Sequence, residues 1–497
     1  MLVAFAVGVL TPSTPELALA EGVSREYLLH HRLCPKSRGD DGSVIVAVAP
    51  NALLDGLDDI ACAYHCIVVA EPATGDEVER LIERLTTRSD RDIELASAGD
   101  DDDLAADVRD LANQPPVIRY VNLLVKEAYN AAASDIHLEA SRTGLVCRFR
   151  LDGVLSQAPD PPPSLHQAVV SRIKLLAELD IAERRKPQDG RIRVRLESRE
   201  LDLRVSTVPT MFGESVVLRL LDRGGRPVAL EELGMPPGIL ECMSALSRRP
   251  HGMILVTGPT GSGKTTTLYA ALQCRDALAE KIITVEEPVE YQLAGITQVP
   301  VHGQAGITFS SALRSILRQD PDVIMIGEMR DRETAEIAVQ AAMTGHLVVA
   351  TLHTNDAITA IPRLLDLGVP DYLVAATVDG ILAQRLVRKI CDDCRVPYEP
   401  PPESVALLAS RPVGKRRFSR GAGCAKCRGT GYRGRMGLFE LLLISDDVKD
   451  AIARRAPRSE MRQIATAAGM RTLRTDGWAK IENGLTTVEE VLRVVQL

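Results

Sequence analysis

Short apolar runs alternate with longer segments of helical periodicity between residues 228 and 390. The apolar runs cover 253–256, 282–285, 323–326 and 347–351, lengths typical of strands that are buried on both faces. Strands that alternate with helices in this way form parallel sheets with crossover helices. We therefore expect an α/β core over residues 226–390.

The pattern upstream of this core has a period of two residues. After an apolar-patterned helix at 117–132, alternating segments with arginine on the polar side predict strands at 145–150, 191–196, 201–205 and 216–220. These arginines fit a solvated face, but they could equally line an interface. Residues 113–225 are therefore expected to form a second, smaller α/β domain that ends in the glycine- and proline-containing linker 224–227.

The first 112 residues predict a further small domain and a linker. A strand pattern at 43–48 and a helical pattern at 76–85 indicate an α/β domain over 1–95, and the acidic run 97–103 indicates a solvated linker over 96–112. Met1–Leu10 is apolar but has no basic flank, which favours ordinary protein over a signal peptide. Cys62, His65 and Cys66 lie close together, and we interpret them as a packed helix face in preference to a metal site.

Composition narrows the functional classes. The chain has 497 residues, which predicts two to four domains, and its net charge of −8 with 3% aromatic residues disfavours a nucleic-acid binder. Apolar runs are shorter than a membrane-spanning helix. We expect a cytoplasmic protein that contacts a membrane only through a partner.

The run from Gly258 to Thr265 fits the phosphate-binding pattern G-x-x-x-x-G-K-[ST] at each fixed position. A chance glycine-rich turn is disfavoured because a strand pattern precedes the run and a helical one follows it. The glycines let backbone N–H groups turn toward a phosphate chain, Lys264 can reach its outer phosphates, and the Thr265 hydroxyl can ligate Mg²⁺. The predicted nucleotide site is Gly258, Pro259, Thr260, Gly261, Ser262, Gly263, Lys264, Thr265 and Thr266.

Polar residues at the ends of the other strands predict hydrolysis. Glu328 ends an apolar strand that begins after Asp322, and it is the better candidate to order Mg²⁺ or activate water. Glu286 ends another strand and is a second candidate, with Glu287 beside it. His353 could sense the γ-phosphate, although a lone histidine is more often structural.

Two C-x-x-C pairs, with 29 residues between them, offer four thiolates. This set matches tetrahedral Zn²⁺ with no open position, so the site would be structural. A redox pair is the alternative, and the presence of two matched pairs favours metal. The predicted ligands in the insert 391–427 are Cys391, Cys394, Cys424 and Cys427.

In their order along the chain, these motifs resemble the ATPases of the type II secretion and type IV pilus assembly superfamily, closest to the general secretion pathway protein E subgroup. The resemblance runs from about Asn113 to the C-terminus. Besides the sites above, the matching segments are Ala133–Glu139, Arg148–Gly153, Pro187–Arg191, Asp202–Ser206, Leu313–Asp322, Gly327–Arg330 and Gly429–Arg435.

The resemblance implies roles for individual residues. Glu328 corresponds to the Walker B glutamate, His353 to the histidine box, and Glu286 with Glu287 to an aspartate box whose usual second residue is aspartate. Arg204 and Arg219 correspond to arginines that approach nucleotide from a mobile lobe. Further arginines of the nucleotide or subunit-contact region correspond to Arg314, Arg318 and Arg330.

The resemblance also implies an architecture and partners. It predicts a RecA-like motor domain in a homo-hexamer, preceded by a PAS-like α/β domain and followed by a helical C-terminal region at 428–497. The cofactors would be ATP, Mg²⁺ and Zn²⁺. The N-terminal domain would dock on the membrane-anchored general secretion pathway protein L, and the ring would act on an inner-membrane platform protein, peripheral to the inner membrane. By this resemblance we expect a motor ATPase of a type II secretion system, which hydrolyses ATP to drive pseudopilus assembly and export of folded proteins across the outer membrane. A type IV pilus extension motor, a nucleic-acid translocase and a nucleotide-gated scaffold are the alternatives.

Overall fold

The computed structural model describes residues 25–38, 43–53, 56–64, 66–89, 113, 115–196, 199–222, 228–409 and 418–495. The leading apolar segment, the acidic linker, His65 and the linker at 224–227 lie outside these residues, as does the side chain of Cys62, so the interpretation of Cys62, His65 and Cys66 stays a prediction. The chain divides into two compact units, drawn mainly from residues up to 218 and from residue 219 onward.

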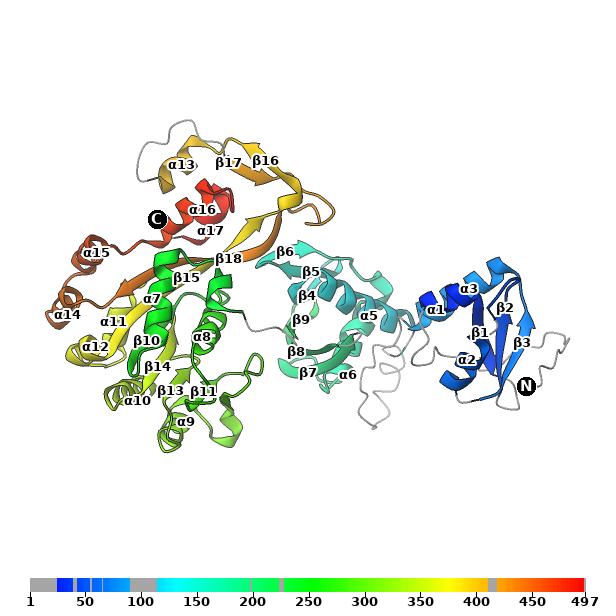
Figure 1. Ribbon diagram of the computed structural model, residues 1–497, viewed down its shortest axis with the longest axis horizontal. Coiled ribbons are helices and arrows are strands. Elements are labelled where there is room, and N and C mark those ends of the chain that lie inside the picture. Colours follow the sequence, from blue (N-terminus) through cyan, green and yellow to red (C-terminus); the bar gives the residue numbers. More distant parts are fainter. Residues whose placement is uncertain are drawn as a thin grey trace. The chain divides into compact units, whose positions relative to one another are not determined.

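The N-terminal part is a three-stranded sheet with three helices (Figure 1). Its middle strand pairs antiparallel with the first and parallel with the third, and apolar side chains such as Leu33, Val46 and Ile60 form its core. Both elements predicted here are confirmed. The elements are α1 (Arg25–His31), β1 (Leu33–Arg38), β2 (Val44–Val48), α2 (Gly56–Tyr64), β3 (Val68–Pro72) and α3 (Gly75–Ser89).

The next part contains a six-stranded sheet of order β6-β5-β4-β9-β8-β7. Along β7, Ile192, Val194 and Leu196 are buried while the arginines between them are exposed, so the predicted alternation is confirmed. The predicted helix ends at Asn130, and β4 is an additional strand. The elements are α5 (Pro115–Asn130), β4 (Ala133–Ser141), β5 (Gly144–Leu151), β6 (Val154–Gln157), α6 (His166–Leu176), β7 (Gln188–Leu196), β8 (Arg199–Thr210) and β9 (Gly213–Asp222).

The α/β core is a seven-stranded sheet of order β12-β11-β13-β14-β10-β15-β18, parallel except at the β15–β18 pair. All four predicted strands are present, and β12 and β15 extend the sheet. The elements up to β15 are α7 (Pro237–Ser247), β10 (Gly252–Thr257), α8 (Lys264–Leu272), β11 (Ile282–Glu286), β12 (Thr297–Pro300), α9 (Phe309–Ile316), β13 (Val323–Ile326), α10 (Arg332–Met343), β14 (Leu347–Leu352), α11 (Ala360–Asp366), α12 (Asp371–Thr377) and β15 (Val378–Ile390).

Helices cover both faces of this sheet because successive strand residues point to opposite sides. Met253 and Leu255 of β10 belong to the buried cluster that contains apolar residues of α9 and α10, whereas Ile254 and Val256 belong to the cluster that contains residues of α7 and α8. Every residue of β10 is buried. The polar side chains that could bind a ligand are therefore expected in the loops at the carboxyl ends of the parallel strands.

The C-terminal segment departs from the expected helical region at its start. Tyr432–Leu443 form a long strand that pairs antiparallel with β15 from Gly380↔Leu443 to Ile390↔Tyr432, so the helical region begins only at Asp446. The remaining elements are β16 (Arg395–Tyr398), α13 (Pro402–Leu408), β17 (Phe418–Gly421), β18 (Tyr432–Leu443), α14 (Asp446–Ala453), α15 (Arg458–Ala467), α16 (Leu473–Glu482) and α17 (Val488–Val494).

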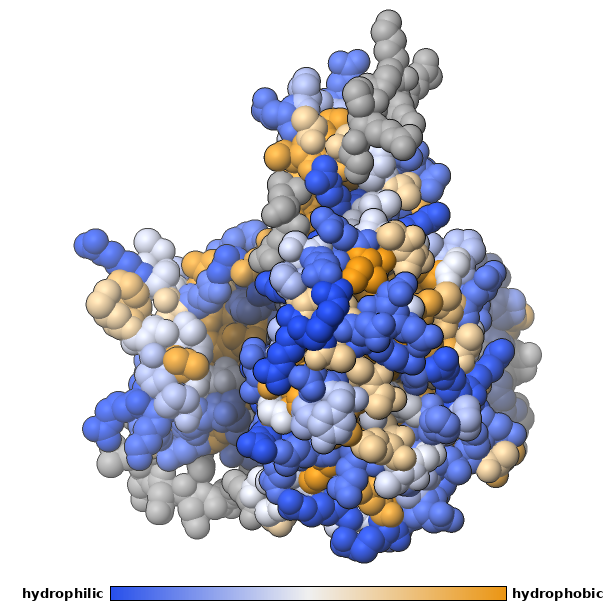
Figure 2. All heavy atoms as spheres, turned by 90° about the vertical axis from the view of Figure 1, so that its left-hand side faces the viewer, coloured by the Kyte–Doolittle hydropathy of each residue, from blue (hydrophilic) through white to orange (hydrophobic). Residues whose placement is uncertain are grey.

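Hydrophilic side chains cover most of the face that Figure 2 turns to the viewer, and apolar side chains stand singly or in small groups among them. Such a mixture is ordinary for a globular surface. None of the helices in the described ranges combines the length and the apolar character needed to cross a bilayer.

Candidate active site

The predicted phosphate-binding loop connects the buried strand β10 to α8. Gly258 has a φ of +154° and Gly263 a φ of +85°, and a Cβ atom added at Gly258 would lie 2.5 Å from the carbonyl oxygen of Gln384. Both positions therefore need glycine, the first for space and the second for its left-handed backbone. This backbone turns the loop into the first turn of α8, where unpaired N–H groups favour an anion.

Lys264 is the first residue of α8, and its side chain turns back into the loop. Its Nζ donates hydrogen bonds to the carbonyl oxygens of Gly258 at 2.8 Å and Pro259 at 3.1 Å. Burial lowers the pKa of Lys264 to about 8, the negative charge of Glu328 raises it, and the nearby positive charge of Arg385 lowers it. A lysine amine in this position is a ready donor to an anionic phosphate, which is a stronger acceptor than a neutral carbonyl.

Two hydroxyl positions fit a bound nucleotide. The Ser262 Oγ is buried and has no hydrogen-bond partner among the residues that the structure describes. Buried hydroxyls are usually paired, so a phosphate oxygen would satisfy it. Thr265 and Thr266 are half-exposed in the first turn of α8, and Thr265 would be the residue to hold Mg²⁺, which when bound supplies charge neutralisation for phosphoryl transfer.

Glu328, directly after β13 and Gly327, has a partner on each carboxylate oxygen. Its Oε2 lies 2.8 Å from Arg330, and its Oε1 lies 2.9 Å from the Nε2 of His353. Burial raises the pKa of Glu328, but the hydrogen bond from Arg330 and the charge of His353 outweigh it and hold the pKa below its usual value. Arg330 also pairs with Glu287 at 3.2 Å. The structure thus brings two predicted catalytic residues, Glu328 and His353, into direct contact.

Glu286 has a different environment. Its carboxylate is buried and accepts hydrogen bonds from the hydroxyls of Tyr269 and Thr284 and from Gln298 Nε2 at 3.1 Å. None of its described contacts is with Glu328. The structure therefore places Glu286 beneath α8, where it ties the phosphate-loop helix to β11.

The other predicted polar residues lie as follows. Asp322 is at the opposite end of β13, where its carboxylate accepts the Lys281 backbone N–H at 2.7 Å.

The predicted arginines lie on separate elements. Arg204 is on β8, opposite Arg191 in the strand register, and Arg219 is on β9, where its Nε is 2.9 Å from Asp135. Arg314 pairs with Glu333, and Arg318 donates to the Arg314 carbonyl oxygen at 2.7 Å.

Two residues of β15 were missed by the sequence interpretation. Gln384 accepts a hydrogen bond from the Thr267 hydroxyl at 2.6 Å, and the buried guanidinium of Arg385 donates to the Asn355 carbonyl oxygen at 2.7 Å. Burial lowers the pKa of Arg385. No sequence motif marks these residues, and they lie beside the loop because β15 pairs with β10.

The four predicted zinc ligands meet in one cluster. The Sγ atoms of Cys391 and Cys424 are 3.9 Å apart, those of Cys394 and Cys427 are 3.8 Å apart, and all four lie within 4.8 Å of one another. A tetrahedral zinc with Zn–S bonds of about 2.3 Å requires sulfur atoms about 3.8 Å apart. The donor set therefore fits Zn²⁺ with no open position.

The backbone supports thiolate character at one of these ligands. Burial raises the pKa of Cys427, but N–H groups of Cys424 and Gly431, 3.1 and 3.3 Å from its sulfur, outweigh this and lower the pKa to about 6. Between the two cysteine pairs, β16 and β17 form an antiparallel ribbon.

Together, the glycine loop after β10, the carboxylate after β13 and the parallel sheet that aligns them define a P-loop nucleoside triphosphatase. The sequence profile of the family described as "Type II/IV secretion system protein" matches residues 110–493. The chain therefore belongs to the type II/IV secretion system protein family.

Similarity to individual proteins supports this family assignment. The chain is 50% identical to the type II secretion system protein HxcR of Pseudomonas aeruginosa over 82% of this chain and 83% of that protein. It is 47% identical to the type II secretion system protein E of Xanthomonas campestris pv. campestris over 97% of this chain and 87% of that protein. Among solved structures, the pilus retraction motor PilT with bound ADP matches 75% of this chain and 96% of its own, with 29% identity and a TM-score of 0.51.

Proposed function

We propose that this chain is the motor ATPase of a type II secretion system, which hydrolyses ATP with Mg²⁺ to drive assembly of a pseudopilus and the export of folded proteins. The observation that carries the proposal is the Glu328 carboxylate, held on both oxygens by Arg330 and His353. The names of these two relatives support secretion as the process that the ATPase serves.

The residues divide the work of phosphoryl transfer. The backbone N–H groups of 258–263 and the Lys264 amine would bind the phosphate chain. Glu328 would orient or deprotonate the attacking water, and its lowered pKa keeps it ionised as an acceptor. His353 would hydrogen-bond the outermost phosphate while it fixes Glu328. Glu286 is the less direct candidate, since Tyr269 and Gln298 would have to release it before it met water or Mg²⁺.

The remaining predicted roles extend this scheme. Arg204 and Arg219 would reach the nucleotide by closure of the domain that carries them, and an arginine delivered in this way accelerates phosphoryl transfer by ~10³–10⁵-fold. Six copies would form a ring, with Arg314, Arg318 and Arg330 near the nucleotide or the neighbouring subunit. The cysteine cluster would hold a structural Zn²⁺.

The proposed place of work is the cytoplasmic face of the inner membrane. There, the N-terminal domain would dock on the cytoplasmic part of general secretion pathway protein L, and the ring would act on the platform protein. Membrane contact would be indirect, and no role for nucleic acid is proposed.

Two measurements test the proposal. Purified full-length chain should release phosphate from ATP in the presence of Mg²⁺, faster when the partner's cytoplasmic domain is added, and DNA should not stimulate it. In the host, deletion of the gene should abolish export of the secreted enzymes, and wild-type but not Glu328→Gln protein should restore it. Loss of surface pili with normal export would instead identify a type IV pilus extension motor.

A further inference from the structure

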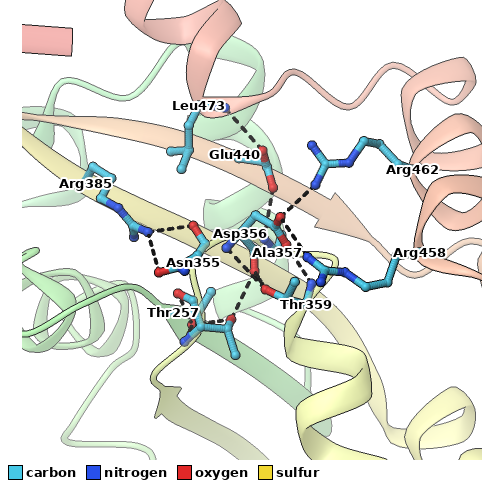
Figure 3. A network of polar contacts seen from close by, with 11 residues as sticks. Thr257, Asn355, Asp356, Ala357, Thr359, Arg385, Glu440, Arg458, Arg462 and Leu473 are labelled. Carbon is cyan, nitrogen blue, oxygen red and sulfur yellow. Dashed lines mark hydrogen bonds and ion pairs between the residues drawn. The ribbon is translucent and has the colours of Figure 1, made fainter. Parts of the chain in front are cut away.

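A stretch of five consecutive residues, 353–357, leaves β14 and contacts a different element at each position. Figure 3 shows the part of this network around Asn355, Asp356 and Ala357. The contacts run from His353 to Glu328, from Thr354 to Thr257, from Asn355 to Arg385, from Asp356 to Arg462 and from Ala357 to Glu440. We call residues 353–357 the histidine segment.

The front of the histidine segment is joined to the phosphate loop. Thr257, the last residue of β10, directly precedes Gly258. Its Oγ1 accepts the Thr354 backbone N–H at 2.8 Å, and the two threonine hydroxyls are 2.8 Å apart. The Thr354 hydroxyl also donates to the Asp356 carbonyl oxygen at 3.0 Å. Thr354 therefore links the backbone of Asp356 to the strand that precedes the phosphate loop.

The back of the histidine segment is held by the C-terminal helices. Asp356 Oδ2 lies 2.7 Å from Arg462 and 3.7 Å from Arg458, both on α15, while its Oδ1 accepts the Thr359 backbone N–H at 2.7 Å. In Figure 3 both arginines extend from their helix toward Asp356. One carboxylate thus closes the local turn and binds a helix more than a hundred residues later in the chain.

A second link runs through the buried carboxylate of Glu440. It accepts the Ala357 N–H at 2.9 Å and the N–H of Leu473, the first residue of α16, at 3.2 Å. The histidine segment is therefore fixed to two separate C-terminal helices as well as to the sheet.

Attachment of the helices to the core is the simplest role for these contacts. However, Arg458 and Arg462 are 59% and 44% exposed, so solvent screens their side of each ion pair although the Asp356 carboxylate itself is mostly buried, and such pairs add only modest stability. Their effect is directional, because they fix a carboxylate three residues from His353. An ion pair that adds little to the free energy of unfolding but orients the segment next to His353 is suited to regulating the active site.

We propose that Asp356 is a positioning residue for ATP hydrolysis, through which α15 sets the placement of His353 against Glu328. The proposal rests on the proposed ATPase function and adds a route by which the C-terminal helical region regulates it. Movement of α15 releases Asp356, loosens the histidine segment and slows turnover without removing any group that contacts nucleotide.

The test compares Arg462→Gln, Arg462→Lys, Asp356→Asn and the double variant Asp356→Asn/Arg462→Gln in full-length chain. Arg454→Gln is the matched control, since Arg454 pairs with Glu460 within the same helical region at 2.6 Å. We expect Arg462→Gln and Asp356→Asn each to lower kcat roughly five- to tenfold, with the KM for ATP changed less than about twofold. The double variant should be no slower than the slower single variant, because both act through one contact. Arg462→Lys should retain most of the turnover.

Hydrogen exchange supplies a readout that needs no turnover. The amides of Thr354 and Ala357 should exchange faster in Arg462→Gln than in wild type, and Arg454→Gln should leave them unchanged. Unchanged kcat and unchanged exchange in Arg462→Gln would overturn the inference, as would losses in the double variant that simply multiply or an equal loss in Arg454→Gln. Wild-type chain that binds ATP but releases no phosphate, even with its partner, would overturn the proposed function instead, and the exchange data would still decide the link from Arg462 to the segment.

Discussion

The Nε2 of His353 lies 2.9 Å from the Oε1 of Glu328, and Arg330 occupies the other carboxylate oxygen at 2.8 Å. Two partners on two oxygens fix the plane of the carboxyl group as well as its position. A group held in this way needs little reorganisation when it meets water, which is the main protein contribution to phosphoryl transfer. The contact joins the ends of two neighbouring strands, β13 and β14.

Glu328→Gln should reduce phosphate release by at least about 100-fold, because the amide can neither accept a proton nor carry the negative charge. ATP binding should persist, since the phosphate loop is untouched, whereas Lys264→Ala should lose both binding and turnover. Phosphate release and binding of a fluorescent ATP analogue measure the two effects. Glu336→Gln, which removes an exposed partner of Arg332, is the control. Wild-type release by Glu328→Gln would exclude Glu328 from the chemistry.

The pH dependence of ATP binding should follow Lys264. Its pKa of about 8 in the free chain means that the ammonium form, which binds phosphate, is lost as the pH rises through 8. Because bound phosphate favours the charged form, kcat/KM for ATP should fall about tenfold per pH unit above that value. Glu328 has a lowered pKa, so it stays ionised throughout this range. A profile of kcat/KM that is flat between about pH 7 and 9.5 would contradict the assignment.

Tyr269→Phe should destabilise the motor domain by about 1.5–3 kcal/mol, because it leaves the buried Glu286 carboxylate one donor short. Burial and the hydrogen bond to Glu286 raise the pKa of Tyr269, so its hydroxyl remains a donor. A fall in melting temperature checks this, with Tyr372→Phe at an exposed tyrosine as the control.

A comparison of Glu286→Gln with Tyr269→Phe distinguishes a structural role of Glu286 from a catalytic one. If it anchors α8, Glu286→Gln and Tyr269→Phe should lower kcat by similar, modest factors, and this is the result that its contacts lead us to expect. A loss of more than about 100-fold in Glu286→Gln alone would return Glu286 to the catalytic group.

Cys427→Ser should lower the zinc content from one ion per chain to a small fraction, because a closed four-thiolate site does not tolerate loss of a ligand. Binding energy on the order of 10 kcal/mol then no longer supports the insert, which should become sensitive to proteolysis. ATP binding should remain, since the phosphate loop is formed by β10 and α8. Cys242→Ser, outside the cluster, is the control. Full zinc content in Cys427→Ser would show that the ion is held elsewhere.

The four buried strands of the core were predictable because each is a continuous apolar run between turn residues. β15 and β18 were not, since runs such as Phe439–Leu443 fit a buried helix as well as a strand, and only their mutual pairing decides between the two. In the candidate site, too, residues marked by a local sequence pattern were predictable, and residues whose environment depends on tertiary contacts were not. Glu328 and His353 were recognisable at strand ends, whereas the burial of Glu286 depends on Tyr269 and Gln298, which come from separate elements.

The cysteine cluster lies at the far end of the β15–β18 ribbon, with Cys391 directly after Ile390 and the second pair shortly before Tyr432. The pairing is regular from Gly380↔Leu443 to Arg388↔Arg435 and shifts once before Ile390↔Tyr432, next to the cysteines. Because the four sulfur atoms come from both sides of this ribbon and lie within 4.8 Å of one another, an ion bound by all four would tie the two strand ends together. Bound zinc would therefore brace the two strands that carry Arg385 and Glu440 to the histidine segment, at a place remote from the nucleotide site in sequence.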